Sequence, residues 1–194
     1  PDAVILVDFS GFNLRLAKNI NKRYPVIYYI SPQVWASRQG RVETIRKFID
    51  KLIVIFKFER DFYQKFGIQA EFVGHPLLDI VKPKTDKKSF CQEFGLQENS
   101  PIFALLPGSR ASEVKRILPV MLESARIIQE KITSAQFIIS KPSGMDNSIY
   151  ASSLRGAKRR SNLNLEVKLI DSRQYDCLNA ADFVLVCSGT ATLE

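Results

Sequence analysis

The residues best suited to chemistry lie in the turn Pro107-Gly108-Ser109-Arg110, which follows an apolar run over residues 102–106. The run is typical of a buried parallel strand, and apolar residues at helical spacing from Val114 onward predict a helix after the turn. A strand, a glycine-containing turn and a helix leave backbone N–H groups that can bind an anion. Gly108 permits a close approach, and Arg110 can form a bidentate pair with phosphate. From the turn alone, an ordinary loop with a solvated arginine is an equally good interpretation.

A second turn of small residues follows the apolar run 183–187 and reads Ser188-Gly189-Thr190-Ala191-Thr192. Its hydroxyl and amide groups suit a diphosphate at the start of a helix, where Glu194 could meet ribose hydroxyls. Simple N-capping by Ser or Thr is the alternative interpretation. Together with the first turn, it gives two amide-rich turns at strand ends of the same block, and this combination favours an anion site.

Asp8 is the candidate general base, because it follows the apolar run 3–7 and precedes Phe9 and Phe12. An exposed aspartate has a pKa of about 3.9 and is a weak base, so burial beside these rings would make it a stronger one. The alternative is an aspartate that caps the following helix, and the local sequence alone favours this capping role.

The segment 31–41 places the single tryptophan of the chain, Trp35, beside Arg38 and Arg41. An aromatic ring next to guanidinium groups suits a surface that grips an acyl or aromatic group beside a phosphate. A tryptophan that plugs a core between domains is the alternative, but the polar flanking residues favour a functional role. His75, before Pro76 at a strand end, is more typical of a structural turn.

The elements that must position these residues alternate between strand and helix. The expected strands are 3–7, 26–30, 52–56, 70–73, 102–106, 136–140, 165–170 and 183–187, and helical patterns lie between them. Such alternation predicts an α/β protein with parallel sheets covered on both faces. The long helix after residue 110 is expected to start properly near Pro119, because proline is tolerated in a first turn but not inside a helix.

The residues 82–88, rich in lysine and containing Pro83, are the best linker in the sequence. We therefore expect two Rossmann-like domains, 1–83 and 84–194. Ligands in such folds bind at the carboxyl ends of the strands. The polar candidates above all lie at those ends, which favours an enzyme with a cleft over a scaffold.

Composition narrows the class of protein. The chain has 194 residues, 45% of them hydrophobic and 25% charged, which is ordinary for a globular protein and excludes global disorder. The net charge of +8 indicates an anionic partner, either nucleic acid, a phosphorylated small molecule or an acidic membrane surface. A basic helix end at 153–160 is by default solvated, with attraction to anionic lipid as the functional alternative.

Three cysteines and one histidine limit the possible metal and disulfide chemistry. The cysteines fit neither a disulfide framework nor a zinc site, which indicates a reducing cytosol. Because the chain has a single histidine, most histidine-based metal sites and Ser-His-Asp triads are excluded, and no metal or cofactor is expected. No apolar run has the length of a membrane span. The chain lacks an initiator Met and ends where a helix is expected to begin, so we expect an internal fragment.

Several motifs together resemble one family, the lipid-A-disaccharide synthases, over essentially the whole chain. The most specific is the block Ser31-Pro32-Gln33-Val34-Trp35-Ala36, followed by Arg38 and Arg41. The others, in order, are Val7-Asp8-Phe9-Ser10-Gly11-Phe12-Asn13, Phe72-Val73-Gly74-His75-Pro76, Leu105-Leu106-Pro107-Gly108-Ser109-Arg110 with Glu113, and Ser188-Gly189-Thr190-Ala191-Thr192-Leu193-Glu194.

The resemblance implies a GT-B glycosyltransferase, with both of its Rossmann-like domains incomplete here. The family joins UDP-2,3-diacylglucosamine to 2,3-diacylglucosamine 1-phosphate, with inversion and without a metal, to give a β-1,6 disaccharide and UDP. It also implies a cytoplasmic enzyme, peripheral on the inner face of the inner membrane and in contact with its anionic surface. Whether it forms a homo-oligomer stays open.

Carried over by position, Asp8 would be the base that deprotonates the acceptor 6-hydroxyl. The donor side would comprise Gly108, Ser109, Arg110, Glu113, Ser188, Gly189, Thr190, Ala191 and Glu194. The acceptor or lipid side would comprise Ser10, Asn13, Ser31, Trp35, Arg38, Arg41 and His75. Family members also have an amino-terminal Ser-Gly-Asp turn and continue past the position of Glu194, so we expect this fragment alone not to turn over substrate.

Two alternatives stay open at this point. One is a related GT-B protein, such as a peptidoglycan N-acetylglucosaminyltransferase or a UDP-sugar epimerase, against which the Trp35 block argues. The other is a basic module that binds nucleic acid and is not an enzyme. Against it, the basic residues are scattered over several helices and no nucleic-acid motif is present, so we expect no nucleic-acid partner.

Overall fold

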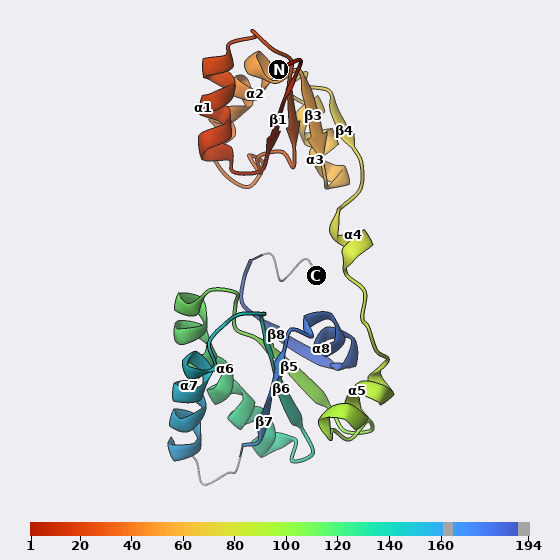
Figure 1. Cartoon of the computed structure of the whole chain (residues 1–194), viewed down its shortest axis with the longest axis vertical. Helices are drawn as coiled ribbons and strands as arrows, with labels where there is room; N and C mark the ends of the chain where they lie inside the picture. The colour runs from red at the N-terminus through yellow and green to blue at the C-terminus, as the bar shows by residue number, and fades with distance from the viewer. Residues whose placement is uncertain (161–164, 190–194) are drawn as a thin grey trace. The chain divides into compact units, whose positions relative to one another are not determined.

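The computed structural model describes residues 1–160 and 165–189, and the chain forms two compact units, Pro1–Ile80 and Val81–Glu194 (Figure 1). Each unit contains one four-stranded parallel sheet. The expectation of two parallel α/β domains of Rossmann-like type is confirmed.

The first unit has a sheet whose strands follow one another in chain order, β1-β2-β3-β4. Neighbouring strands pair in register, with Val7 opposite Tyr29 and Tyr29 opposite Ile53, so their carboxyl ends form one edge. The elements are β1 Val4–Val7, α1 Ser10–Ile20, β2 Val26–Tyr29, the 3-10 turn Gln39–Arg41, α2 Val42–Phe48, β3 Lys51–Val54, α3 Lys57–Gln64, β4 Ala70–Phe72 and α4 Leu77–Ile80.

One face of this sheet carries the core of the first unit. Alternate strand residues such as Leu6, Tyr28 and Leu52 are buried against the helices. On the opposite face Ile5 and Val7 are 65% and 51% exposed. The expectation of cover on both faces is therefore wrong for the described part of this unit. The reason is topological: right-handed crossovers that always step in the same direction place all their helices on the same face.

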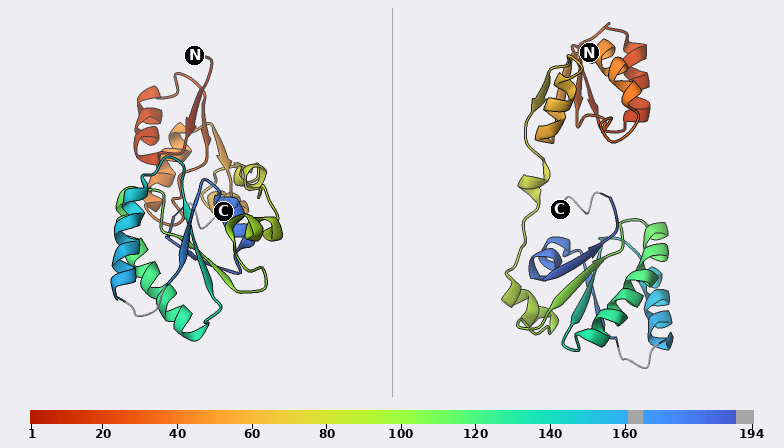
Figure 2. Two further views of the ribbon diagram at one scale, coloured as in Figure 1. Left: turned by 60° about the horizontal axis from the view of Figure 1, so that its bottom comes forward. Right: turned by 180° about the vertical axis from the view of Figure 1, so that it is seen from behind.

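The second unit has the strand order β7-β6-β5-β8, all parallel. Helices α6 and α7 cover one face and α5 and α8 the other (Figure 2), with a buried cluster on each side. All five residues of the central strand β5 are buried. The elements are α5 Lys87–Phe94, β5 Ile102–Leu106, α6 Ala111–Lys131, β6 Gln136–Lys141, α7 Asn147–Arg160, β7 Val167–Asp171, α8 Gln174–Ala180 and β8 Phe183–Val186.

Strand order in this unit reverses at β5, since β6 lies on one side of it and β8 on the other. The loops after β5 and β8 consequently leave the sheet on either side of a crevice. This is the topological switch point at which open α/β sheets bind their ligands.

Helix α6 differs from the sequence expectation, because it begins at Ala111 and has Pro119 inside it. A proline at an interior position lacks the N–H of one helical hydrogen bond and is usually costly. Here Val114 and Leu118, both fully buried, anchor the first two turns to the sheet. Packing of these turns outweighs the local penalty, which sequence spacing cannot show.

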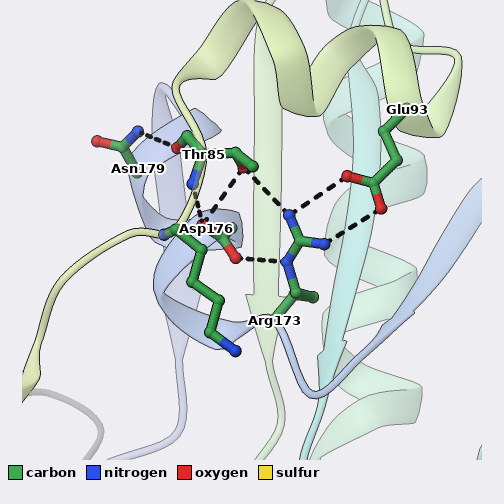
Figure 3. A network of polar contacts seen from close by, with 6 residues as sticks. Thr85, Glu93, Arg173, Asp176 and Asn179 are labelled. Carbon is green, nitrogen blue, oxygen red and sulfur yellow. Dashed lines mark hydrogen bonds and ion pairs between the residues drawn. The ribbon is translucent and has the colours of Figure 1, made fainter.

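The second half of the expected linker has a fixed path, because Asp176 of α8 fastens it to the unit (Figure 3). The backbone N–H groups of Lys84 and Thr85 donate to Asp176 Oδ1 at 2.5 and 2.9 Å, and Arg173 Nε donates to its Oδ2 at 2.5 Å. The Arg173 guanidinium also pairs with Glu93 at 3.1 Å. Asp176 is 2% exposed. Burial raises its pKa, but the hydrogen bonds from Arg173 and the two amides outweigh burial and leave the pKa below its ordinary value.

Candidate functional site

A pocket of about 200 Å³ lies at the carboxyl ends of β5, β6 and β8 in the second unit. It is the crevice at the strand-order reversal. Its lining residues are Leu106, Gly108, Ser109, Arg110, Glu113, Ser140, Pro142, Gln174, Cys187, Ser188 and Gly189. The two turns predicted from the sequence thus meet in one pocket, although 78 positions separate Arg110 from Ser188. Thr190, Ala191 and Glu194 lie outside the described residues.

Gly108 is required where it stands, for two reasons. Its φ of +119° lies in the region that side chains rarely adopt, and a Cβ there would meet Glu113 Oε2 at 2.7 Å. Any larger residue would push Glu113 and the start of α6 away from the turn. The backbone at Gly108 thus approaches Glu113 closely, while the predicted close approach to a phosphate stays a prediction.

Glu113 occupies the backbone groups that were expected to bind phosphate. Its Oε2 accepts from the N–H groups of Ser109 and Arg110 at 3.2 and 3.3 Å, and its Oε1 pairs with Arg110 at 2.6 Å. The bond from Arg110 is the main reason that the pKa of Glu113 is lowered. The protein's own carboxylate therefore sits at the first turn, and an anion can use these two amides only after Glu113 moves.

Three polar pocket residues were not selected from the sequence: Ser140 at the end of β6, Gln174 at the start of α8, and Cys187 after β8. Their position could have marked them as pocket residues, because each lies at the carboxyl end of a strand or just after one. No residue type singled them out, so pattern reasoning missed them.

Asp8 lies at the carboxyl end of β1 in the first unit, in a backbone that is held unusually firmly. Asp8 and Phe9 have φ values of +46° and +34°, which non-glycine residues rarely adopt. The Asn13 amide donates to the carbonyls of Val7 and Asp8 at 2.9 and 2.8 Å, and the Tyr28 hydroxyl also donates to the Asp8 carbonyl. Burial raises the pKa of Tyr28 to about 12, so this hydroxyl keeps its proton.

The capping interpretation of Asp8 is wrong, because the residue at the N-cap of α1 is Phe9 and no side-chain hydrogen bond caps this helix. The expected burial of Asp8 is also absent: the residue is exposed, and Phe9 and Phe12 are 71% and 57% exposed. Their rings stack on each other with centroids 6.3 Å apart. The Asp8 carboxylate is thus presented to solvent by a rigid turn.

The remaining acceptor-side candidates fall into two groups at the same edge. Arg41 donates to Ser10 Oγ at 2.9 Å, which ties the 3-10 turn to the start of α1, and Arg38 is exposed. Ser31 and Trp35 bond instead to a residue that sequence reasoning missed, Glu59 of α3. A buried carboxylate inside the charged stretch 57–61 gives no local signal.

His75 has a structural contact of the expected kind. Its Nδ1 accepts from the backbone N–H of Leu77 at 3.1 Å, and its ring lies 5.3 Å from that of Phe56. Its Nε2 is buried, with no hydrogen-bond partner among the described residues. The turn role fits these contacts, and a role toward the acceptor stays a prediction.

Within residues 1–160 and 165–189, no cluster of histidine, cysteine, aspartate and glutamate could hold a metal ion. None of the helices in this part of the chain is long and apolar enough to cross a membrane.

Comparison with known proteins gives one consistent family. A profile of the lipid-A-disaccharide synthetase family matches residues 1–194. The lipid-A-disaccharide synthase of Syntrophus aciditrophicus is 45% identical over 195 residues, that of Trichlorobacter lovleyi 42% over 195, and lipid-A-disaccharide synthase 1 of Legionella pneumophila 42% over 199. All of this chain is covered in each case, and it spans about half the length of these relatives.

Among solved structures, the chain is similar to the UDP-GlcNAc 2-epimerase of Methanocaldococcus jannaschii, with a TM-score of 0.54 and 16% identity. The likeness covers 98% of this chain and 57% of that one, and at such low identity it shows the fold alone. The sequence relationship is far more specific. Because the profile and the curated relatives cover this chain from its first residue to its last, the chain belongs to the lipid-A-disaccharide synthetase family.

Proposed function

We propose that this chain supplies the donor pocket and part of the acceptor side of a glycosyltransferase of lipid A biosynthesis. The reaction joins UDP-2,3-diacylglucosamine to 2,3-diacylglucosamine 1-phosphate, with inversion at the sugar carbon, and releases UDP. Support comes from family membership and the names of the relatives. The observation that carries the proposal is that both anion-binding turns line one pocket at the strand-order reversal.

In this reaction the leaving group is a diphosphate, which gains negative charge as its bond to the sugar breaks. No metal takes part in the proposed step, so that charge is stabilised by Arg110 and by backbone N–H groups of the two turns. Both turns follow paired strands of the same sheet, which holds their backbones at one edge. The donors of the first turn become available to the diphosphate once Glu113 releases them.

Asp8 has the role of general base toward the acceptor. The 6-hydroxyl oxygen attacks the anomeric carbon, the bond from that carbon to the diphosphate oxygen breaks, and the hydroxyl proton passes to the Asp8 carboxylate. The bonds from Asn13 and Tyr28 fix the backbone of Asp8 and so keep the carboxylate at one place on the edge.

The acceptor is a lipid, so its acyl chains require an apolar surface on the protein. The protein must also be attracted to the membrane that holds this lipid. Trp35 and Phe58 supply exposed aromatic surface, and the net charge of +8 favours the anionic cytoplasmic leaflet. Each basic residue near such a surface contributes about 1 kcal/mol, screened by salt. Vesicles with anionic lipid should bind the full-length protein at low salt and release it at high salt, and indifference to salt would contradict this part.

The test of the whole proposal uses the full-length protein and three measurements. Formation of the disaccharide 1-phosphate with release of UDP is followed directly, and UDP and a single-stranded oligonucleotide are titrated in parallel by calorimetry. Turnover with UDP binding supports the proposal. Oligonucleotide binding without UDP binding would replace it with the nucleic-acid module, and UDP binding with epimerisation of a UDP-sugar would replace it with the epimerase.

A further inference from the structure

Glu59, near the start of α3, is a buried carboxylate without an assigned role. It is 1% exposed, although it lies in the charged stretch Lys57-Phe58-Glu59-Arg60-Asp61. No lysine or arginine in the described part of the chain forms an ion pair with it. A carboxylate buried away from cations is costly and persists only where several hydrogen bonds compensate.

Three neutral donors compensate here. Ser31 Oγ and Trp35 Nε1 donate to Glu59 Oε1 at 3.2 and 3.3 Å, and the Phe56 N–H donates to Oε2 at 3.2 Å. Burial raises the pKa of Glu59, and these bonds offset only part of that effect. The carboxylate therefore joins two residues of the loop after β2, which lie 28 and 24 positions away in sequence, to the start of α3.

The same helix holds the loop after β2 at a second point. One turn beyond Glu59, the buried Tyr63 hydroxyl donates to the Pro32 carbonyl at 2.8 Å. Ser31, Pro32 and Trp35 are thus all bonded to the inner side of α3. The loop has a defined path at the carboxyl edge, the edge at which Asp8 also lies.

The consequence concerns the orientation of the Trp35 ring. Its N–H side is bonded to Glu59, and its ring meets the Phe58 ring edge-on with centroids 4.9 Å apart. Phe56 stacks on Phe58 at 5.6 Å. Trp35 stays 37% exposed and Phe58 47% exposed. The polar atom of the indole is satisfied within the protein, and apolar ring surface is left for a ligand.

We propose that Glu59 is a positioning residue, which fixes Trp35 so that Trp35 and Phe58 form an apolar shelf for an acyl chain of the acceptor. The inference rests on the proposed function, because it takes the lipid acceptor from there. A carboxylate is needed, since all three partners are donors. An amide at position 59 would turn an NH₂ group toward either the indole N–H or the Phe56 N–H.

The first measurement is spectroscopic and does not depend on activity. The indole ¹H–¹⁵N NMR peak of Trp35 is assigned in the full-length protein by its loss in Trp35→Phe. Glu59→Gln should shift this peak, because the charge-assisted hydrogen bond is lost. The matched control is Asp61→Asn, on the exposed side of the same helix, whose ion pair is with Arg60. It should leave the peak in place.

The second measurement separates the shelf from a merely structural role. Glu59→Gln should raise the KM for the diacylated acceptor about tenfold, with UDP affinity unchanged. The increase should shrink to less than twofold for an acceptor with short acyl chains, which has little to place on the shelf. Trp35→Phe should also raise the KM for the diacylated acceptor. The double variant should be no worse than Glu59→Gln, because both changes remove one shared hydrogen bond.

The outcomes are distinguishable. If wild-type protein neither binds UDP nor forms disaccharide, the proposed function fails. If wild-type protein works but Glu59→Gln matches Asp61→Asn in KM, or raises KM equally for short and long chains, the shelf is wrong while the proposed function stands. Should Glu59→Gln fail to fold, Trp35→Phe and Phe58→Ser decide instead: an unchanged acceptor KM in both would overturn the inference.

Discussion

The two sheets present their carboxyl edges in different ways. In the second unit the edge is made of short turns: small residues after β5 and β8 line one pocket, and Glu113 accepts from the N–H groups of the first turn. In the first unit the edge is made of side chains, with Asn13 and Tyr28 holding a left-handed turn at Asp8 and Glu59 holding the loop after β2.

Topology explains the difference. Strand order reverses at β5 in the second unit, which opens a crevice that needs only short turns to bind an anion. The described strands of the first unit run in sequential order and open no such crevice. Polar groups must there be held in place by hydrogen bonds from buried side chains. A site of the first kind depends on small residues, and one of the second kind on a few buried polar contacts.

The largest effect is expected from Asp8→Asn in the full-length protein. The change removes the proton acceptor while it keeps the shape of the side chain, and the bonds from Asn13 and Tyr28 reach the unchanged backbone carbonyl. We expect kcat to fall about 10²- to 10⁴-fold, with UDP affinity near normal. Rate assays and UDP titration measure both quantities. A variant with full kcat would remove Asp8 from catalysis.

Asp176→Asn should have the largest effect on stability, and its effect should be confined to the second unit. The change weakens the bond to Arg173 and the clamp on Lys84 and Thr85 in a site that is 2% exposed. Loss of one partner of a buried pair costs about 3 kcal/mol. Amide hydrogen exchange should show faster opening around α5 and α8, with β1–β3 unaffected. An equal loss of protection from exchange in both sheets would contradict this expectation.

The pH dependence follows from the lowered pKa of Asp176. Its stabilising contribution is fully present above the unfolded pKa of about 3.9 and is lost as the pH falls through the lower folded value. Asp176→Asn should remove this part of the acid sensitivity of the second unit.

Arg110→Ala tests the backbone-built site. Arg110 is 77% exposed at its side chain and pairs with Glu113, so it can turn to a diphosphate. A charge-assisted bond present in both ground and transition states should weaken UDP binding about 10- to 100-fold. Arg126→Ala is the matched control, because Arg126 lies on the same helix and pairs with Glu123 and Glu130. Equal UDP affinity in both variants would exclude a diphosphate role for Arg110.

Glu113→Gln examines whether the protein's own carboxylate competes with the diphosphate. Glutamine can still cap the amides of Ser109 and Arg110, but it lacks the charge that repels phosphate. We expect UDP to bind roughly twofold to fivefold more tightly, as for other exposed charge pairs. Glu130→Gln on the same helix is the control. Weaker UDP binding in Glu113→Gln would show that the carboxylate helps to build the site.

The smallest effect is the pH response of the first unit, and it has the opposite sign to that of the second. Burial raises the pKa of Glu59 above its unfolded value of about 4.3. Its contribution to stability is fully present below pH 4.3 and is lost as the pH rises through the folded pKa. Hydrogen exchange across β1–β3 at several pH values measures this, and Glu59→Gln should flatten the response. A first unit that gains stability with rising pH would contradict it.

Much of the fold and two turns of the pocket in the second unit followed from the sequence, because the signals are local. Apolar runs separated by helical patterns predicted each of the eight strands found in the described part of the chain. The turns at 107–110 and 188–189 were found by their small residues. They had to share an edge, since the carboxyl ends of parallel strands do, and the structure places them in one pocket.

Tertiary structure decided the rest, because the deciding contacts join residues far apart in the chain. The sequence around Glu59 and Asp176 is polar and locally typical of a surface, yet both carboxylates are buried. Glu59 accepts from Ser31 and Trp35, at least 24 residues away in sequence. Asp176 accepts from the backbone of Lys84 and Thr85, at least 91 residues away. Pro119 lies inside α6 because Val114 and Leu118 pack on the sheet. Spacing along a chain determines which residues share a face, whereas burial and hydrogen bonding depend on which distant segment packs against that face.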